Sequence, residues 1–206
     1  EDQRVDPAAE DNEAIRAASE IGRLTVVNRL LQDERVDPAV NDNEAIRWAS
    51  HNGHSAIVNR LLEDQRVDPA AEDNAAIRWA SENSHLCVVN RLLEDERVDP
   101  ATAENSAIRC ASDTGHLSVV NRLLEDKRVD PAARNNSAIR AASRYGHLSV
   151  VNRLLEDNRV DPAALNNTAI QWASKNGHLF VVNRLLQDTR VDPAAQDNNA
   201  ICWASQ

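Results

Sequence analysis

A 31-residue unit repeats along this chain without a single insertion or deletion. Each copy opens with Arg-Val-Asp-Pro, and the seven openings begin at Arg4, Arg35, Arg66, Arg97, Arg128, Arg159 and Arg190. With each of these arginines counted as position 1, copies 1 to 6 span residues 4–34, 35–65, 66–96, 97–127, 128–158 and 159–189, and a partial copy 7 spans residues 190–206. A fixed period of this length is typical of a solenoid, in which one small unit stacks on the next. The pattern therefore predicts a single solenoid domain over residues 1–206.

The residue pattern within each copy predicts two short helices. In copy 4, Asn105 at position 9 is a good N-cap residue, so we expect a first helix over positions 10–17. Gly115 at position 19 supplies the left-handed turn that commonly ends a helix. Leucine and valine then recur at spacings of three and four, which predicts a second helix over positions 21–29 and argues against a strand. Asp99 and Pro100 at positions 3 and 4 predict a further helical turn between copies.

The positions that repeat are expected to hold the stack together. In copy 4 the predicted core consists of Ala107, Ile108, Ala111, Leu117, Val120, Leu123 and Leu124. A mid-helix asparagine at position 25 is a poor helix former, so its persistence predicts an amide hydrogen-bonded to the next copy. The repeated arginines and aspartates are expected to form ladders of opposite charge along the surface.

The helix pair resembles the ankyrin repeat. Copy after copy along the whole chain has the motif Asn-x-Ala-Ile-Arg-x-Ala-Ser-x-x-Gly-His-Leu-x-Val-Val-x-x-Leu-Leu. It is similar to the motif of the ankyrin family, which is Thr-Pro-Leu-His-x-Ala-Ala-x-x-Gly-His-x-x-Val-Val-x-x-Leu-Leu. The usual ankyrin unit is about 33 residues long, and the two residues missing here fall where the family forms its β-hairpin. The resemblance therefore implies an all-α solenoid with shortened or absent hairpins. It also implies that the His at position 20 ties the turn between the helices.

Positions that vary between copies are candidates for function. Positions 10, 14, 17 and 18 have helical spacing, so their side chains share one face of the first helix, here called the first-helix face. In the family this face lines a concave groove that grips partner proteins. Every aromatic residue of the chain is at a variable position, and aromatic residues are common interface hot spots. The predicted partner-binding residues are Trp48, Trp79, Cys110, Trp172, Trp203, Tyr145, Phe180, Glu13, Glu20, Glu44, His51, Glu82, Asp113, Arg144 and Lys175.

Two alternatives stand beside this interpretation. The tryptophans at position 14 are close to the predicted core positions 11, 12 and 15 of the first helix, so they could instead pack between copies. The variable charges are acidic in the first four copies and turn basic at Arg134, Arg144 and Lys175, which suits a partner of matching polarity but also suits drift among exposed positions.

Composition argues against several other functions. The net charge of −10 is expected to repel nucleic acid, and no apolar run is long enough to span a membrane. The three cysteines fall at three different repeat positions, which favours an intracellular, cytoplasmic location over a disulfide framework. His51 and His54 have weak metal-ligand spacing without acidic or thiolate partners, so neither a metal nor a cofactor is expected. No motif of an enzyme active site is present in the sequence.

The sequence thus predicts a monomeric, non-enzymatic solenoid that binds another protein through its first helices. The shortened unit is also similar to tandem arrays of protists and giant viruses, which implies a host protein as the target, for example a cytoskeletal protein such as actin. The alternatives are a structural spacer, a fragment of a longer array, or a designed repeat scaffold. Ser55 and Ser84 stand at positions that otherwise repeat as leucine and glycine, and such departures argue against a design. The stop after one helix of copy 7 favours a fragment.

Overall fold

The computed structural model describes residues 6–192, which hold twelve helices and no strand. Contacts divide the chain into two compact units, unit 1 over Glu1–Thr102 and unit 2 over Ala103–Gln206. The predicted all-α solenoid of helix pairs is confirmed, and a hairpin is absent from the described residues. A single domain over residues 1–206 stays a prediction.

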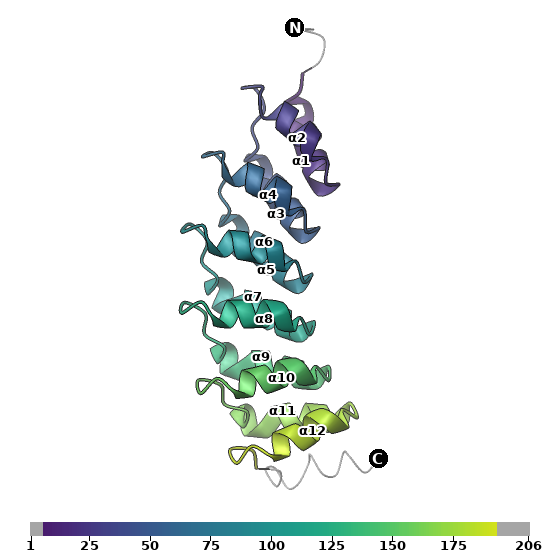
Figure 1. The fold of residues 1–206 in the computed structure, drawn as a ribbon, viewed down its shortest axis with the longest axis vertical. Helices are drawn as coiled ribbons and strands as arrows, with labels where there is room; N and C mark the ends of the chain where they lie inside the picture. Colours follow the sequence, from purple (N-terminus) through teal and green to yellow (C-terminus); the bar gives the residue numbers. More distant parts are fainter. Residues whose placement is uncertain (1–5, 193–206) are drawn as a thin grey trace. The chain divides into compact units, whose positions relative to one another are not determined.

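Unit 1 stacks three helix pairs in two layers (Figure 1). The first helices are α1 (Ala9–Glu20), α3 (Val40–His51) and α5 (Ala71–Glu82), and each packs on the next. The second helices form the other layer: α2 (Leu24–Leu30), α4 (Ser55–Leu62) and α6 (Leu86–Leu93). The first layer therefore presents one continuous face built from equivalent positions of successive copies.

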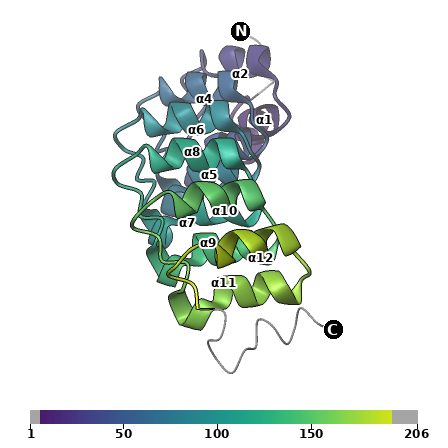
Figure 2. The ribbon, with the colours of Figure 1, turned by 60° about the horizontal axis from the view of Figure 1, so that its bottom comes forward.

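Unit 2 repeats this arrangement (Figure 2). Its first helices are α7 (Thr102–Asp113), α9 (Ala133–Arg144) and α11 (Ala164–Lys175). Its second helices are α8 (Leu117–Leu124), α10 (Leu148–Leu155) and α12 (Leu179–Leu186). Within the unit α9 packs on α11, and α10 packs on both α8 and α12.

The predicted core of copy 4 is largely correct. Ala107, Ile108, Ala111, Val120 and Leu123 are all buried. The two outer leucines of the predicted stripe, at positions 21 and 28, are only half-buried, whereas the valine at position 23 is fully buried and was not predicted. The second helix therefore buries a stripe made of Val119, Val120 and Leu123, which is shifted from the predicted one.

The start of the first helix differs from the prediction. Positions 7 to 9, for example Ala103, Glu104 and Asn105, all have positive φ and make one left-handed turn. The regular helix follows over positions 10–17, as predicted. Asn105 does not cap this helix, because its Oδ1 accepts a hydrogen bond from the backbone N–H of Asp130 in the next copy, at 2.7 Å. The N-cap prediction for position 9 is therefore wrong, and this asparagine links two copies.

The arginine at position 13 holds the left-handed turn, and the aspartate at position 3 caps the turn before it. Arg109 Nε and Nη2 donate to the carbonyl oxygens of Glu104 and Ala103, at 3.0 and 3.1 Å. The aspartate at position 3 caps the preceding turn, as predicted: Asp68 Oδ1 accepts from the Ala70 N–H at 2.9 Å. Three left-handed residues cost roughly 1–2 kcal/mol each, so these bonds offset a real penalty.

Within each unit, histidine and arginine tie a copy to the copy before it. His54 Nε2 donates to the carbonyl of Glu20 at 2.9 Å, so the histidine bridges two copies rather than only its own turn. Arg66 forms a two-bond pair with Asp64 and donates from Nη1 to the carbonyl of Val36 at 2.8 Å. The arginine at position 1 thus pairs with the aspartate of its own turn, and it reaches the preceding copy through a guanidinium–carbonyl bond.

The asparagine at position 25 does not make the predicted bond. The buried Oδ1 atoms of Asn90, Asn121 and Asn152 have no hydrogen-bond partner among the described residues. The predicted hydrogen bond from this amide to the next copy is therefore wrong, and nothing in the structure explains why this asparagine repeats.

Candidate functional site

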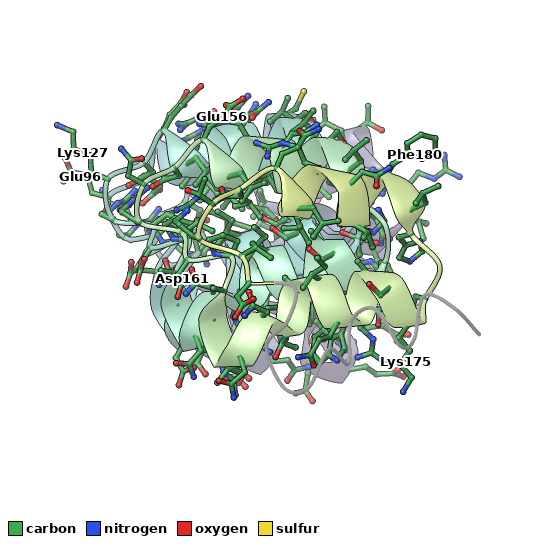
Figure 3. The ribbon with its side chains drawn as sticks, turned by 90° about the horizontal axis from the view of Figure 1, so that it is seen from below. Glu96, Lys127, Glu156, Asp161, Lys175 and Phe180 are labelled. Carbon is green, nitrogen blue, oxygen red and sulfur yellow. The ribbon has the colours of Figure 1, made fainter. Side chains whose placement is uncertain are left out.

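The first-helix face carries most of the predicted partner-binding residues. Seven of them are exposed on it: Glu13, Glu20, Glu82, Asp113, Arg144, Tyr145 and Lys175. The half-buried members are Glu44, Trp48, His51, Trp79, Cys110 and Trp172. Phe180 is 75 % exposed but belongs to α12 in the second layer, and Figure 3 shows it apart from Lys175 at the end of α11. Trp203 lies outside the described residues.

Two tryptophans of unit 1 pack together across successive copies. The ring centroids of Trp48 and Trp79 are 5.5 Å apart, and His51 makes edge contacts with both, at 5.2 and 5.8 Å. The guanidinium of Arg47 lies 5.6 Å from the Trp79 centroid. Aromatic pairs of this kind stabilise by about 0.5–1.5 kcal/mol beyond their buried area. These tryptophans are therefore held in fixed orientations while part of each ring stays accessible.

Glu44 fixes one edge of this cluster. Its Oε1 accepts a hydrogen bond from Trp48 Nε1 at 3.1 Å, and Arg16 of the preceding copy forms an ion pair with its Oε2. Burial alone would raise the pKa of Glu44, but the hydrogen bonds from Arg16 and Trp48 outweigh burial and lower it. The carboxylate thus stays ionised and orients the indole.

A second aromatic group lies in unit 2, on copies 5 and 6. The guanidinium of Arg144 is 5.3 Å from the Trp172 centroid and 5.4 Å from that of Tyr145. Arg140 lies over the same indole, at 5.5 Å. In both units the residue at position 14 is thus flanked by positions 13 and 17 of the preceding copy. Packing between copies and exposure at the face therefore occur together at position 14.

A family model for ankyrin repeats matches residues 14–104 and 107–197, which is most of the chain. The chain belongs to the ankyrin-repeat family. Members of this family generally mediate protein–protein binding and are typically non-enzymatic scaffolds. The predicted family is therefore confirmed.

Three solved structures have a similar fold. A chain of the complex between the predatory endopeptidase Bd0816 of Bdellovibrio bacteriovorus and immunity protein Bd3460 is 20% identical with a TM-score of 0.71, covering 86% of this chain and 98% of that one. The human ASB11 ankyrin repeat domain is 18% identical with a TM-score of 0.69, covering 92% and 96%. The ankyrin repeat domain of Bcl-3 is 20% identical with a TM-score of 0.71, covering 91% and 90%. At these identities the likeness shows the fold alone. No curated protein matches the sequence significantly.

This ankyrin-repeat chain has two units of very different charge. Residues 1–102 contain 11 Lys and Arg against 22 Asp and Glu, a net charge of −11. Residues 103–206 contain 12 against 11, a net charge of +1. The net charge of the chain is thus almost entirely the charge of unit 1, and the first-helix faces of the two units offer a partner different electrostatic surfaces.

Sequence reasoning missed the arginines at position 13, because they repeat and were therefore read as framework. Arg47 and Arg140 contact the tryptophan of the next copy, 32 residues further on. The signal that could have found them is this spacing, since position 13 of one copy and position 14 of the next lie side by side once the copies stack.

An open pocket of about 340 Å³ lies on copy 1, away from the tryptophans. It is lined by Asp6, Pro7, Ala9, Glu10, Glu13, Ala14 and Ala17. The adjacent carboxyl group of Glu13 raises the pKa of Glu10. Ala14 is exposed, whereas its equivalents Ala45 and Ala76 are buried. The pocket is therefore the surface that other copies cover with their predecessor.

The described helices are all too short and too polar to cross a membrane. Residues 6–192 also hold no group of three or more His, Cys, Asp or Glu side chains arranged to ligate a metal ion.

Proposed function

We propose that this chain binds another protein through its first-helix face, with Trp48, Trp79 and Trp172 as the main contacts. In the ankyrin family the same face lines the concave groove that holds partners. The observation that carries the proposal is the state of these three tryptophans. Each ring is held by charged or aromatic neighbours and is still partly accessible.

Held, partly exposed aromatic side chains suit a binding surface for a physical reason. A side chain that is already ordered loses little conformational entropy when a partner covers it. Trp48, Trp79 and Trp172 come from copies 2, 3 and 6, whereas Ala17 and Ala141 occupy the same position in copies 1 and 5. The stack therefore forms without a tryptophan at position 14, which supports a role in binding.

The similarity of the shortened unit to arrays of protists and giant viruses supports a host protein as the partner. The charge difference between residues 1–102 and 103–206 supports a partner that carries both basic and acidic regions.

The test begins with capture of partners by the wild-type chain and identification by mass spectrometry. The dissociation constant of each purified partner is then measured for Trp48→Ala, Trp79→Ala and Trp172→Ala. Loss of an aromatic hot spot typically costs about 2 kcal/mol or more, which corresponds to a loss of affinity of roughly 30-fold. We expect a loss of that size for at least one of the three variants.

Arg122→Ala on α8 is the matched control, because this arginine belongs to the second layer and pairs with Glu125 at 3.9 Å. It should leave the affinity unchanged. A partner that tolerates all three tryptophan variants but is lost with Arg122→Ala or Phe180→Ala would show that the second layer is the binding surface, and would contradict the proposal.

A further inference from the structure

Four side chains of unit 2 form what we call the arginine–aromatic cluster: Arg140, Arg144, Tyr145 and Trp172. Arg144 is exposed and lies over both rings, and Arg140 is half-buried against the same indole. Stacking on aromatic faces holds a guanidinium in place while its edge remains free to donate hydrogen bonds.

In the part of the chain that the structure describes, the two arginines of the cluster are not paired with an acidic side chain. Among the residues that the structure describes, neither guanidinium lies within ion-pair distance of a carboxylate. Arg140 Nε and Nη2 donate to the carbonyls of Asn135 and Arg134, at 3.0 and 3.1 Å, whereas the Arg144 guanidinium donates no hydrogen bond to any described residue. The equivalent Arg16 in unit 1, by contrast, is neutralised by Glu44.

The surroundings of Arg140 disfavour its charged form. Burial, together with the nearby charge of Arg134, lowers the pKa of the Arg140 guanidinium. Arg134 itself pairs with Glu104 at 2.8 Å. An anion placed against Arg140 and Arg144 would therefore stabilise two guanidinium groups that pair with no carboxylate among the described residues.

We propose that the arginine–aromatic cluster binds carboxylates of an acidic segment of the partner protein. This inference rests on the proposed function, and it names the chemistry that one part of the first-helix face recognises. A guanidinium fork matches the two oxygens of a carboxylate, and the exposed side of Tyr145 offers apolar surface to the methylene groups of Asp or Glu. The acidic segment would be repelled by the first-helix face of unit 1, since residues 1–102 carry a net charge of −11.

A protein carboxylate fits this cluster better than a nucleic acid does. Nucleic-acid binding depends on neutralising many phosphates with clustered Lys and Arg. Residues 103–206 carry a net charge of only +1, and the cluster supplies two arginines. Two guanidinium groups can pair with a few carboxylates of a peptide, but they cannot neutralise a run of phosphates.

The test uses isothermal titration calorimetry on the full chain. The probes are a 12-residue peptide of Glu-Gly-Glu-Leu repeats, the same peptide with every Glu replaced by Lys, and a single-stranded oligonucleotide of 12 nucleotides. The variants are Arg140→Gln, Arg144→Gln and their combination. Glutamine fits position 13, because Gln171 of copy 6 still donates from Nε2 to the Asn166 carbonyl at 2.8 Å. Arg153→Gln on α10 removes the same charge from the second layer of the same copy and is the control.

We expect the Glu peptide to bind the wild type, the double variant to lose at least tenfold in affinity, and the control to bind as the wild type does. Absence of binding by the Glu peptide, equal binding by the Lys peptide, or an affinity unchanged in the double variant would each overturn the inference. Tighter binding of the oligonucleotide, with the same dependence on Arg140 and Arg144, would overturn it in favour of a nucleic acid. A natural partner that depends on Trp48 and Trp79 but not on Arg140 and Arg144 would leave the proposed function standing without this inference.

Discussion

Ser84 has a backbone conformation that its residue type disfavours. Its φ of 65° lies in the left-handed region, and the equivalent position is a glycine in Gly22, Gly53, Gly115, Gly146 and Gly177. A residue with a Cβ costs roughly 1–2 kcal/mol in this conformation, and glycine avoids that cost. Part of the benefit is lost, because glycine has more conformational entropy in the unfolded chain. We therefore expect Ser84→Gly to raise the free energy of unfolding by about 1 kcal/mol, measured by urea denaturation.

The reciprocal change is the control. Gly53 has a φ of 75°, and a Cβ added to it would lie 2.4 Å from Nδ1 of His85. Gly53→Ala should thus destabilise unit 1, both through backbone strain and through displacement of the histidine. Equal effects of the same sign for Ser84→Gly and Gly53→Ala would show that the turn does not depend on glycine.

The second residue-scale prediction separates a core leucine from a surface tryptophan. Leu123 is fully buried, so Leu123→Ala should cost roughly 2–5 kcal/mol. Trp79 is half-buried against Trp48, His51 and Arg47, and its loss should cost about 1–2 kcal/mol from aromatic and cation–π contacts. The free energy of unfolding of each variant is measured by urea denaturation, with circular dichroism as the signal. A cost for Trp79→Ala as large as that for Leu123→Ala would place position 14 in the core and weaken the proposed function.

At the scale of elements, the left-handed turn depends on the arginine at position 13. Arg78 donates to the carbonyls of Asp73 and Glu72 at 3.1 and 3.0 Å. Hydrogen bonds to a charged group contribute about 1.5–3 kcal/mol when well formed, and less when exposed. We expect Arg78→Ala to lower the free energy of unfolding by about 1–2 kcal/mol. Arg78→Gln should lower it less, because Gln171 keeps one such bond in copy 6. Equal losses for the two variants would contradict this role of the guanidinium.

This turn also marks where the sequence ceases to predict the element. The helix over positions 10–17 follows from local periodicity, and the turn glycine at position 19 follows from its own conformational freedom. Glu72, Ala103 and Leu165 have no shared preference for positive φ, yet all three adopt it. Their residue types are not the cause: the turn is held by the side chain at position 13, an arginine in copies 1 to 5 and Gln171 in copy 6, and by the bond from position 9 to the next copy. The N-cap prediction failed for the same reason, because the best partner of the Asn105 amide is 25 residues away.

The candidate surface was predictable in part. Confinement of Trp48, Trp79 and Trp172 to variable positions pointed to the first-helix face. The sequence could not show which side chains flank them, since that depends on how far one copy is displaced from the next. Two opposed interpretations of position 14, packing and exposure, both hold at once because a side chain can cover its predecessor with one edge of its ring and face solvent with the other.

At the scale of the molecule, how much a residue contributes to stability depends on whether a preceding copy packs against it. Val26 on α2 and Val88 on α6 occupy the same repeat position, but Val26 is 45% exposed and Val88 is 0% exposed. Val88→Ala should cost about 2 kcal/mol, and Val26→Ala less than about 1 kcal/mol. Urea denaturation of the two variants gives the comparison. Equal costs would show that the burial of position 23 does not come from stacking on the preceding copy.

The last prediction concerns acid. The aspartate at position 30 recurs as Asp33, Asp64, Asp95, Asp126, Asp157 and Asp188, and in each the hydrogen bond from the arginine two residues later lowers the pKa, to about 2 in Asp33. A carboxyl whose pKa is lower in the folded state than its ordinary value of 3.8 stabilises the fold when ionised in both states. Its contribution is complete above about pH 5 and is lost as the pH falls through about 4 towards 2.

We therefore expect the urea midpoint of the chain to fall steeply below pH 4, as the repeated pairs are protonated together. Asp95→Asn should lower the midpoint at pH 6 and flatten its dependence on pH, since the variant has one such carboxylate fewer. Glu96→Gln is the matched control, because it removes a carboxylate from the adjacent exposed position, for which no ion pair is formed with Arg97. Since both variants change the net charge equally, general repulsion among the positive charges at low pH affects them alike. A pH profile that is the same for Asp95→Asn and Glu96→Gln would show that acid acts on the net charge of the molecule and not on the repeated aspartate–arginine pair.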